Sequence, residues 1–239
     1  MKRLSLVQYS AIGLIFTSLL MYYVYYSQTG NFNSPIIEYE FVQNQQDVKN
    51  IFIENNELKQ DVILGIKNQN IVDYVFMILY TSLLVLAFAE ISKSEKKKIY
   101  TLGIIFSFTA LIGDIFENIQ LFQISELLLN RTDFSHHVDL LFIITRVKWL
   151  SLAFALFILS SHYYKYKFLG KLFSLISALP FLNILTFIIL SNNTDDNFYT
   201  IFTNFIMLGF VVLIIWIFIP ENNKGKIISF YNSGKSQTI

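Results

Sequence analysis

The chain has 239 residues and a formal net charge of +1; 54% of its residues are hydrophobic and only 15% are charged. A soluble domain usually contains about 25% charged residues, so this composition is typical of an integral membrane protein. No basic stripe with interleaved aromatic residues is present, which argues against nucleic-acid binding. The sequence contains no cysteine, which excludes disulfides, thiolate catalysis and cysteine-ligated metal centres.

Six apolar segments are each long enough to cross the hydrocarbon core of a bilayer, which requires roughly 20 helical residues. They are Tyr9–Tyr26, Ile71–Ile91, Tyr100–Ile124, Val138–Ser160, Leu169–Leu190 and Phe198–Ile219. The first follows Lys2 and Arg3, and no small-residue cleavage site comes after it, so we expect an uncleaved anchor helix. The predicted fold class is all-α, a polytopic membrane helix bundle with six transmembrane helices.

Positive charge alternates between the predicted loops. Most of the 18 Lys and Arg residues lie on the side that carries both termini, and the other side has only Lys49, Lys59, Lys67 and Arg131. Because positive residues accumulate on the cytoplasmic side, we expect both termini to be cytoplasmic (N-in/C-in). The expected location is the cell (inner) membrane, with the lipid bilayer as the first partner.

The chain divides into five predicted regions. These are the first transmembrane anchor helix (1–26), an external amphipathic segment or lid (27–70), transmembrane helices two to four (71–160), transmembrane helices five and six (161–219) and a cytoplasmic tail (220–239). Within the external segment, residues 36–41 (IIEYEF) alternate apolar and charged side chains, as in a short half-buried strand. From Asp47 onward the apolar spacing indicates amphipathic helices at the outer headgroup level, or else a lid over an outward-opening site.

Ionisable side chains interrupt the second, third and fourth spans at similar depths. The orientation places Asp73, Asp114, Glu117, Arg146 and Lys148 in the outer half of the membrane. A charge at the bilayer centre costs roughly 2.5–3.5 kcal/mol on insertion scales, so we expect these groups to face one another inside the bundle. Their summed formal charge is −1. Either one carboxylate therefore holds a proton, or a cation or water completes the site.

Helical spacing groups these side chains further. Asp114, Glu117 and Asn118 share one face of the third span, and Asp73 and Tyr80 share one face of the second. Arg146 and Lys148 diverge by about 200° around the fourth span, so only one of them points at the centre of the bundle. The candidate ligand-binding residues are Asp73, Tyr80, Asp114, Glu117, Asn118, Arg146 and Lys148.

Two histidines precede the fourth span. His136 and His137, with Asp139, are residue types that bind Zn²⁺, and Glu117 could approach them from the third span. Adjacent helical side chains diverge by about 100°, however, so both histidines cannot easily face one metal. We therefore expect solvated loop histidines, with no metal and no cofactor.

Four short stretches within residues 36–160 form a recognisable combination: IEYEF, IVDYVFMILYTSLL, LIGDIFENIQLF and TRVKW. They resemble elements of a group of uncharacterised bacterial multi-pass membrane proteins. That group carries a D-x-x-E-N element in one span, an earlier D-Y-x-F-x-x-x-Y element, and a basic residue before an aromatic one in the next span. The resemblance implies Asp73, Tyr80, Asp114, Glu117, Asn118 and Lys148 as positions to test. It favours Lys148 over Arg146 as the inward-facing cation and implies no particular chemistry.

Three classes of function remain open. The first is binding of a small polar or lipid-headgroup ligand, which includes an enzyme that uses a carboxylate as general acid or base. The second is a structural or assembly subunit whose ion pairs only fix helix packing, with a membrane-protein partner. The third is a proton- or cation-coupled carrier, although the sequence shows no inverted repeat of the kind common in carriers.

Overall fold

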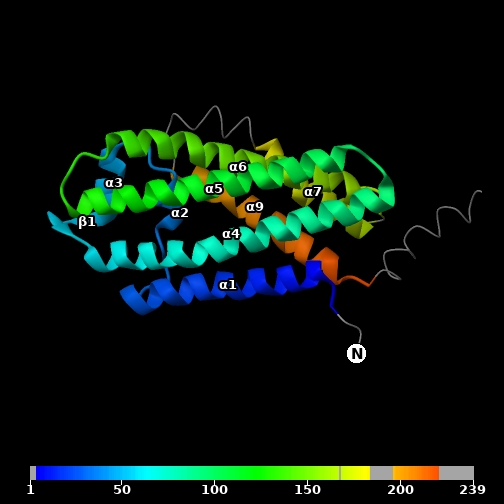
Figure 1. Cartoon of the computed structure of the whole chain (residues 1–239), viewed down its shortest axis with the longest axis horizontal. Coiled ribbons are helices and arrows are strands. Elements are labelled where there is room, and N and C mark those ends of the chain that lie inside the picture. The colour runs from blue at the N-terminus through cyan, green and yellow to red at the C-terminus, as the bar shows by residue number, and fades with distance from the viewer. Residues whose placement is uncertain (1–3, 167, 184–195, 221–239) are drawn as a thin grey trace, which may run out of the picture.

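The computed structural model describes residues 4–166, 168–183 and 196–220 (Figure 1). Within these ranges it is almost entirely helical, which confirms the all-α class. Five helices are long and apolar enough to cross a membrane. They are α1 (Leu6–Thr29), α4 (Gln60–Glu95), α5 (Ile99–Leu129), α6 (Ser135–Tyr163) and α9 (Asp196–Phe218). These helices fit a multi-pass membrane protein.

The predicted fifth span is described only in part. Helix α7 (Phe168–Leu182) is apolar and contains Pro180, but residues 184–190 of that span lie outside the described residues. The predicted tail from residue 221 onward lies outside them as well. The number of six transmembrane helices therefore stays a prediction.

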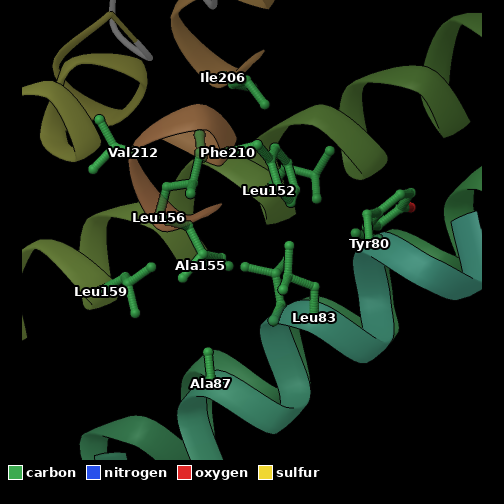
Figure 2. Close-up of a cluster of buried hydrophobic side chains, with 14 of the residues drawn as sticks. Tyr80, Leu83, Ala87, Leu152, Ala155, Leu156, Leu159, Ile206, Phe210 and Val212 are labelled. Carbon is green, nitrogen blue, oxygen red and sulfur yellow. The ribbon is translucent and has the colours of Figure 1, made fainter. Parts of the chain in front are cut away.

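The long helices lie side by side along the long axis of the molecule (Figure 1). Helix α4 packs between α1 and α5, and α6 packs against α5 on one side and α7 on the other. Apolar side chains fill the interior of this bundle. Figure 2 shows Leu83 of α4, Leu156 of α6 and Phe210 of α9 meeting in one part of it.

A second apolar core lies at one end of the bundle. It joins α2 (Ile36–Glu40), α3 (Gln45–Phe52) and the start of α4 to α5 and α6. A hairpin of β1 (Ile53–Glu54) and β2 (Glu57–Leu58) follows α3, with Ile53 opposite Leu58. Asn55 and Asn56 both have positive φ, as a tight two-residue hairpin turn requires.

The predicted strand at residues 36–41 is wrong, because residues 36–40 form helix α2. The helix begins after Pro35, whose ring fixes a backbone angle suited to a helix start. Consecutive residues Tyr39 and Glu40 are both buried, which an alternating strand would not allow. The Tyr39 hydroxyl donates to the Leu121 carbonyl at 2.9 Å and so attaches α2 to α5.

From Asp47 onward the segment is mostly helical, as its apolar spacing predicts, but the β1–β2 hairpin separates α3 from the start of α4. Residues 60–70 continue without interruption into the second predicted span and form one helix with it, α4. The apolar side chains of this segment pack against α5 and α6 in the second core; buried examples are Val48, Phe52, Ile63 and Ile66. This packing holds α2 against the bundle, where one of its side chains reaches the polar site.

Candidate functional site

Lys148 of α6 is the centre of a buried polar cluster. Its Nζ donates to Glu40 Oε2 at 3.0 Å, to Asp114 Oδ1 at 3.2 Å and to Glu117 Oε1. Lys148 is 5% exposed and Glu117 is 0% exposed, so these contacts are shielded from solvent. A single ammonium group therefore joins α2, α5 and α6.

Neutral side chains complete the hydrogen bonding around this centre. The Tyr80 hydroxyl donates to Asp114 Oδ2 at 2.8 Å, and Trp149 Nε1 donates to Glu40 Oε2 at 3.1 Å. Asn118 Nδ2 donates to Asp73 Oδ2 at 2.7 Å, at the half-buried edge of the group. We call these eight residues the Lys148 cluster: Glu40, Asp73, Tyr80, Asp114, Glu117, Asn118, Lys148 and Trp149.

Close packing of α5 on α6 brings the acidic groups to Lys148. A Cβ atom added to Gly113 would lie 3.2 Å from Lys148 Cβ and 3.3 Å from its Cα and backbone N. The absence of a side chain at Gly113 thus lets the backbones approach beside the cluster. The next residue, Asp114, and its i+3 neighbour Glu117 then reach the same ammonium group.

The cluster carries more negative than positive groups. Glu40, Asp73, Asp114 and Glu117 face the single cation Lys148, which gives a formal charge of −3 if all are ionised. Burial raises the pKa of the Glu40 carboxyl, and the charge of Lys148 opposes this effect. Glu117 Oε2 is buried and has no hydrogen-bond partner among the described residues. Uncompensated buried charge is costly, so protons or a cation are needed to offset the excess.

Six of the seven sequence-predicted site residues belong to the cluster, and Arg146 does not. The Arg146 guanidinium lies 3.2 Å above the centre of the Phe142 ring, and Nη1 donates to the Phe142 carbonyl at 2.8 Å. Arg146 also interacts with Tyr199 of α9. The structure thus places Lys148, rather than Arg146, toward the acidic side chains.

Sequence reasoning missed two members of the cluster, Glu40 and Trp149. Glu40 lies between Tyr39 and Phe41. These aromatic neighbours could have indicated that the Glu40 side chain is buried. Interpreting this stretch as a strand concealed that signal. No local pattern indicates that Glu40 pairs with Lys148, which follows 108 residues later.

The expectation of loop histidines is wrong, because His136 and His137 lie in the first turn of α6, and neither joins the cluster. His137 Nδ1 lies 2.8 Å from Gln120 Oε1, while His136 and Asp139 are exposed. Glu117, the carboxylate that could have completed a zinc site, contacts Lys148 instead. Within residues 4–166, 168–183 and 196–220, no group of three or more His, Asp or Glu residues is arranged to hold a metal ion.

A cavity of about 710 Å³ lies between α2, α3 and α9, and no residue of the Lys148 cluster is among the described residues that line it. Acidic and hydroxyl side chains line it together with Phe41, among them Glu38, Asp47 and Thr203. The Phe41 ring stacks on Tyr199 at a centroid distance of 4.4 Å and packs against Trp149 at 6.0 Å. Phe41 therefore contacts both the wall of the cavity and the indole that binds Glu40.

Comparisons with protein-family models, curated proteins and solved structures found no match to the chain.

Proposed function

We propose that this protein is a six-helix membrane protein of the bacterial inner-membrane type that binds a small amine-bearing ligand at the Lys148 cluster. The ligand is a free amine or the amine of a lipid headgroup. Both termini lie in the cytoplasm, which puts the cluster in the outer half of the membrane. The apolar helix α7 supports a sixth span, and the short motifs that resemble those of the bacterial multi-pass group include most of the cluster.

The excess of carboxylates over cations carries this proposal. Among the described residues, four carboxylates gather where one ammonium group is available, and the second oxygen of Glu117 is buried without a hydrogen-bond partner. A second ammonium group would offset part of the charge and donate to that oxygen. Charge-assisted hydrogen bonds of this kind are roughly twice as strong as neutral ones.

The cavity between α2, α3 and α9 provides the route to the cluster. Glu38 and Asp47 at its wall attract a cationic ligand. Phe41 stands between the cavity and Trp149, so a shift of α2 that moves Phe41 would admit the ligand. This helix belongs to residues 27–70, for which the sequence predicts either an amphipathic segment at the headgroup level or a lid.

Binding of ethanolamine tests the proposal. The variant Trp216→Phe leaves Trp149, which touches Glu40, as the only tryptophan. Its fluorescence should change saturably with ethanolamine in detergent micelles. Glu117→Gln should weaken this response more than about 10-fold, because hydrogen bonds to charged groups contribute ~1.5–3 kcal/mol. The matched control is Glu126→Gln, an exposed glutamate on the same helix, and it should leave the response unchanged.

A scaffold function is the second candidate, and the nearly complete hydrogen bonding of the cluster favours it. Buried ion pairs in some proteins specify packing and bind nothing. In that case no amine changes Trp149 fluorescence, and Glu117→Gln lowers the unfolding temperature. The double variant Glu117→Lys with Lys148→Glu would then restore much of the lost stability, and this combination of results would replace the binding proposal.

A further inference from the structure

A second cavity, of about 750 Å³, lies at the lysine-rich end of the bundle. The start of α1 and the C-terminal parts of α4, α6 and α9 surround it; among the lining residues are Ser5, Glu90, Tyr163, Tyr166 and Trp216. Glu90 lies about 25 Å from Asp73 along the axis of α4, given a helical rise of ~1.5 Å per residue. The cavity is therefore separate from the Lys148 cluster.

One wall of this cavity is aromatic. The Trp216 ring lies 5.0 Å from the Tyr163 ring at an interplanar angle of 62°, and 4.6 Å from the Tyr166 ring at 70°. Aromatic rings set at steep angles to one another present both faces and edges to a shared space. Ring faces attract ammonium groups, so an aromatic wall suits a cationic ligand.

The only acidic side chain that lines the cavity in the described part of the chain is Glu90, and no Lys or Arg lines it there. Glu90 is exposed and has no ion pair or hydrogen bond to any described residue. The nearby Glu95 is different, because it pairs with His162 at 2.6 Å and accepts from Tyr100 at 2.6 Å. Glu90 therefore stays available to a ligand, and its charge selects a cation.

The Tyr163 hydroxyl gives the second polar group. Tyr163 is 0% exposed, lines the cavity, and its hydroxyl has no hydrogen-bond partner among the described residues. A buried hydroxyl without a partner is unfavourable, so a ligand that donates to its oxygen gains binding energy there. A primary ammonium group donates hydrogen bonds, whereas a quaternary one cannot.

We propose that this cavity binds a primary ammonium group, held by the Glu90 carboxylate, the aromatic wall and the Tyr163 hydroxyl. Two sources share this chemistry, a phospholipid headgroup and a free amine. Exposed lysines at the same end of the bundle, such as Lys93 and Lys96, suit the phosphate of a phospholipid that carries the amine.

The test uses the full-length protein with Trp149→Phe, so that Trp216 is the only tryptophan. It is reconstituted in liposomes of phosphatidylglycerol alone, or with phosphatidylethanolamine or phosphatidylcholine added. Phosphatidylethanolamine should change Trp216 fluorescence saturably. If the ammonium group belongs to a free amine, ethanolamine added to the phosphatidylglycerol liposomes should also change Trp216 fluorescence. A response to phosphatidylethanolamine or to ethanolamine supports the proposal. An equal response to phosphatidylcholine would overturn the assignment to a primary amine.

Two variants connect the response to the proposed contacts. Glu90→Gln should weaken binding about 10-fold and Tyr163→Phe about 3- to 10-fold, as expected for one charged and one neutral hydrogen bond. Asp61→Asn removes an exposed carboxylate from the other end of α4 and should have no effect. In phosphatidylglycerol alone, Tyr163→Phe should leave the unfolding temperature unchanged or higher, because it removes an unpaired hydroxyl.

Three further results would overturn the proposal: no fluorescence response, a response that Glu90→Gln does not alter, or a loss of stability in Tyr163→Phe without ligand. If Trp149→Phe folds poorly, the unfolding temperature of the chain with both tryptophans provides an independent measure of ligand binding. It is measured in the same liposomes. In that measurement phosphatidylethanolamine should stabilise the unsubstituted protein more than Glu90→Gln.

Discussion

Lys148 and Glu40 are separated by 108 residues, yet the Lys148 ammonium donates to Glu40 Oε2 at 3.0 Å inside the bundle. This contact attaches the short helix α2 to α6, and the same Glu40 oxygen accepts from Trp149. The helix that covers the Lys148 cluster is therefore held by the cluster itself. Any change in charge at the site is expected to reach the external segment.

Removing the central cation should destabilise the protein strongly. Lys148→Met leaves the surrounding carboxylates buried without their shared partner, and loss of one member of a buried ion pair costs about 3–5 kcal/mol. We expect a large drop in unfolding temperature in detergent. Lys49→Met is the matched control, since Lys49 is exposed, and it should have little effect. Equal stability of the two variants would contradict the central place of Lys148.

Removing Glu40 should detach α2 from the bundle. Glu40→Ala eliminates the hydrogen bonds from Lys148 and Trp149, so amide hydrogen exchange across residues 36–41 should accelerate. Glu38→Ala, an exposed position on the same helix, should leave exchange close to that of the unsubstituted protein. Unchanged protection in Glu40→Ala would mean that the second apolar core alone holds α2.

The raised pKa of Glu40 predicts a pH dependence of stability. Burial makes the folded protein hold this proton more tightly than the unfolded chain, where the carboxyl has its ordinary pKa of 4.5. The contribution of the Glu40 proton to the free energy of unfolding is therefore fully present below pH 4.5. It is lost as the pH rises through the raised pKa. Glu40→Gln lacks this titration, so the stability difference between the unsubstituted protein and Glu40→Gln should decrease from pH 4 to pH 8.

Unfolding measured across this pH range checks the prediction, with Glu57→Gln, an exposed glutamate of β2, as the control for the loss of one carboxyl group. If the advantage of the unsubstituted protein instead grew with pH, Glu40 would be ionised in the folded state. The attraction of Lys148 would then outweigh the effect of burial.

The Tyr80 hydroxyl should contribute measurably to stability. It donates to Asp114 Oδ2 at 2.8 Å in a buried position, and removing one partner of such a bond costs about 1–3 kcal/mol. Tyr80→Phe should therefore lower the free energy of unfolding by this amount. Tyr74→Phe makes the same chemical change on α4 at a half-buried position and should be nearly neutral. A neutral Tyr80→Phe would argue that Asp114 obtains its hydrogen bonds elsewhere.

The approach of α5 to α6 at Gly113 should tolerate no added side chain. In Gly113→Ala the new methyl group would press on the Lys148 backbone, which cannot yield without moving the helices apart. We expect a loss of about 1–3 kcal/mol, typical of overpacking. Gly13→Ala meets only the flexible end of Leu79 at 3.1 Å and should be milder. Thermal unfolding of both variants provides the comparison, and equal effects would contradict the prediction.

Local spacing was sufficient to predict much of the cluster. The i, i+3 and i+4 positions of Asp114, Glu117 and Asn118 place them on one face in any α-helix, whatever the surrounding fold. The same geometry separates Arg146 from Lys148, so the sequence shows that only one of them can face the centre. Spacing alone could not show which one, because that choice depends on how α6 is rotated against α5; only the resemblance of the short motifs favoured Lys148.

The external segment shows where local patterns fail. An alternating pattern over six residues is too short to distinguish a strand from one turn of helix. The burial of Tyr39 and Glu40 is decided by α5 and α6, which lie far along the chain, and not by neighbouring residues.

The amino-acid sequence by itself determined that this chain is helical, apolar and interrupted by acidic groups in the second and third spans, because backbone hydrogen bonding and hydrophobicity act on neighbouring residues. Tertiary structure decided that Lys148 is the cation they share, that Glu40 joins them from outside the spans, and that Arg146 lies against Phe142 instead. Such pairings depend on helix rotation and on the path of the connecting segments, which only the packing of the whole chain sets.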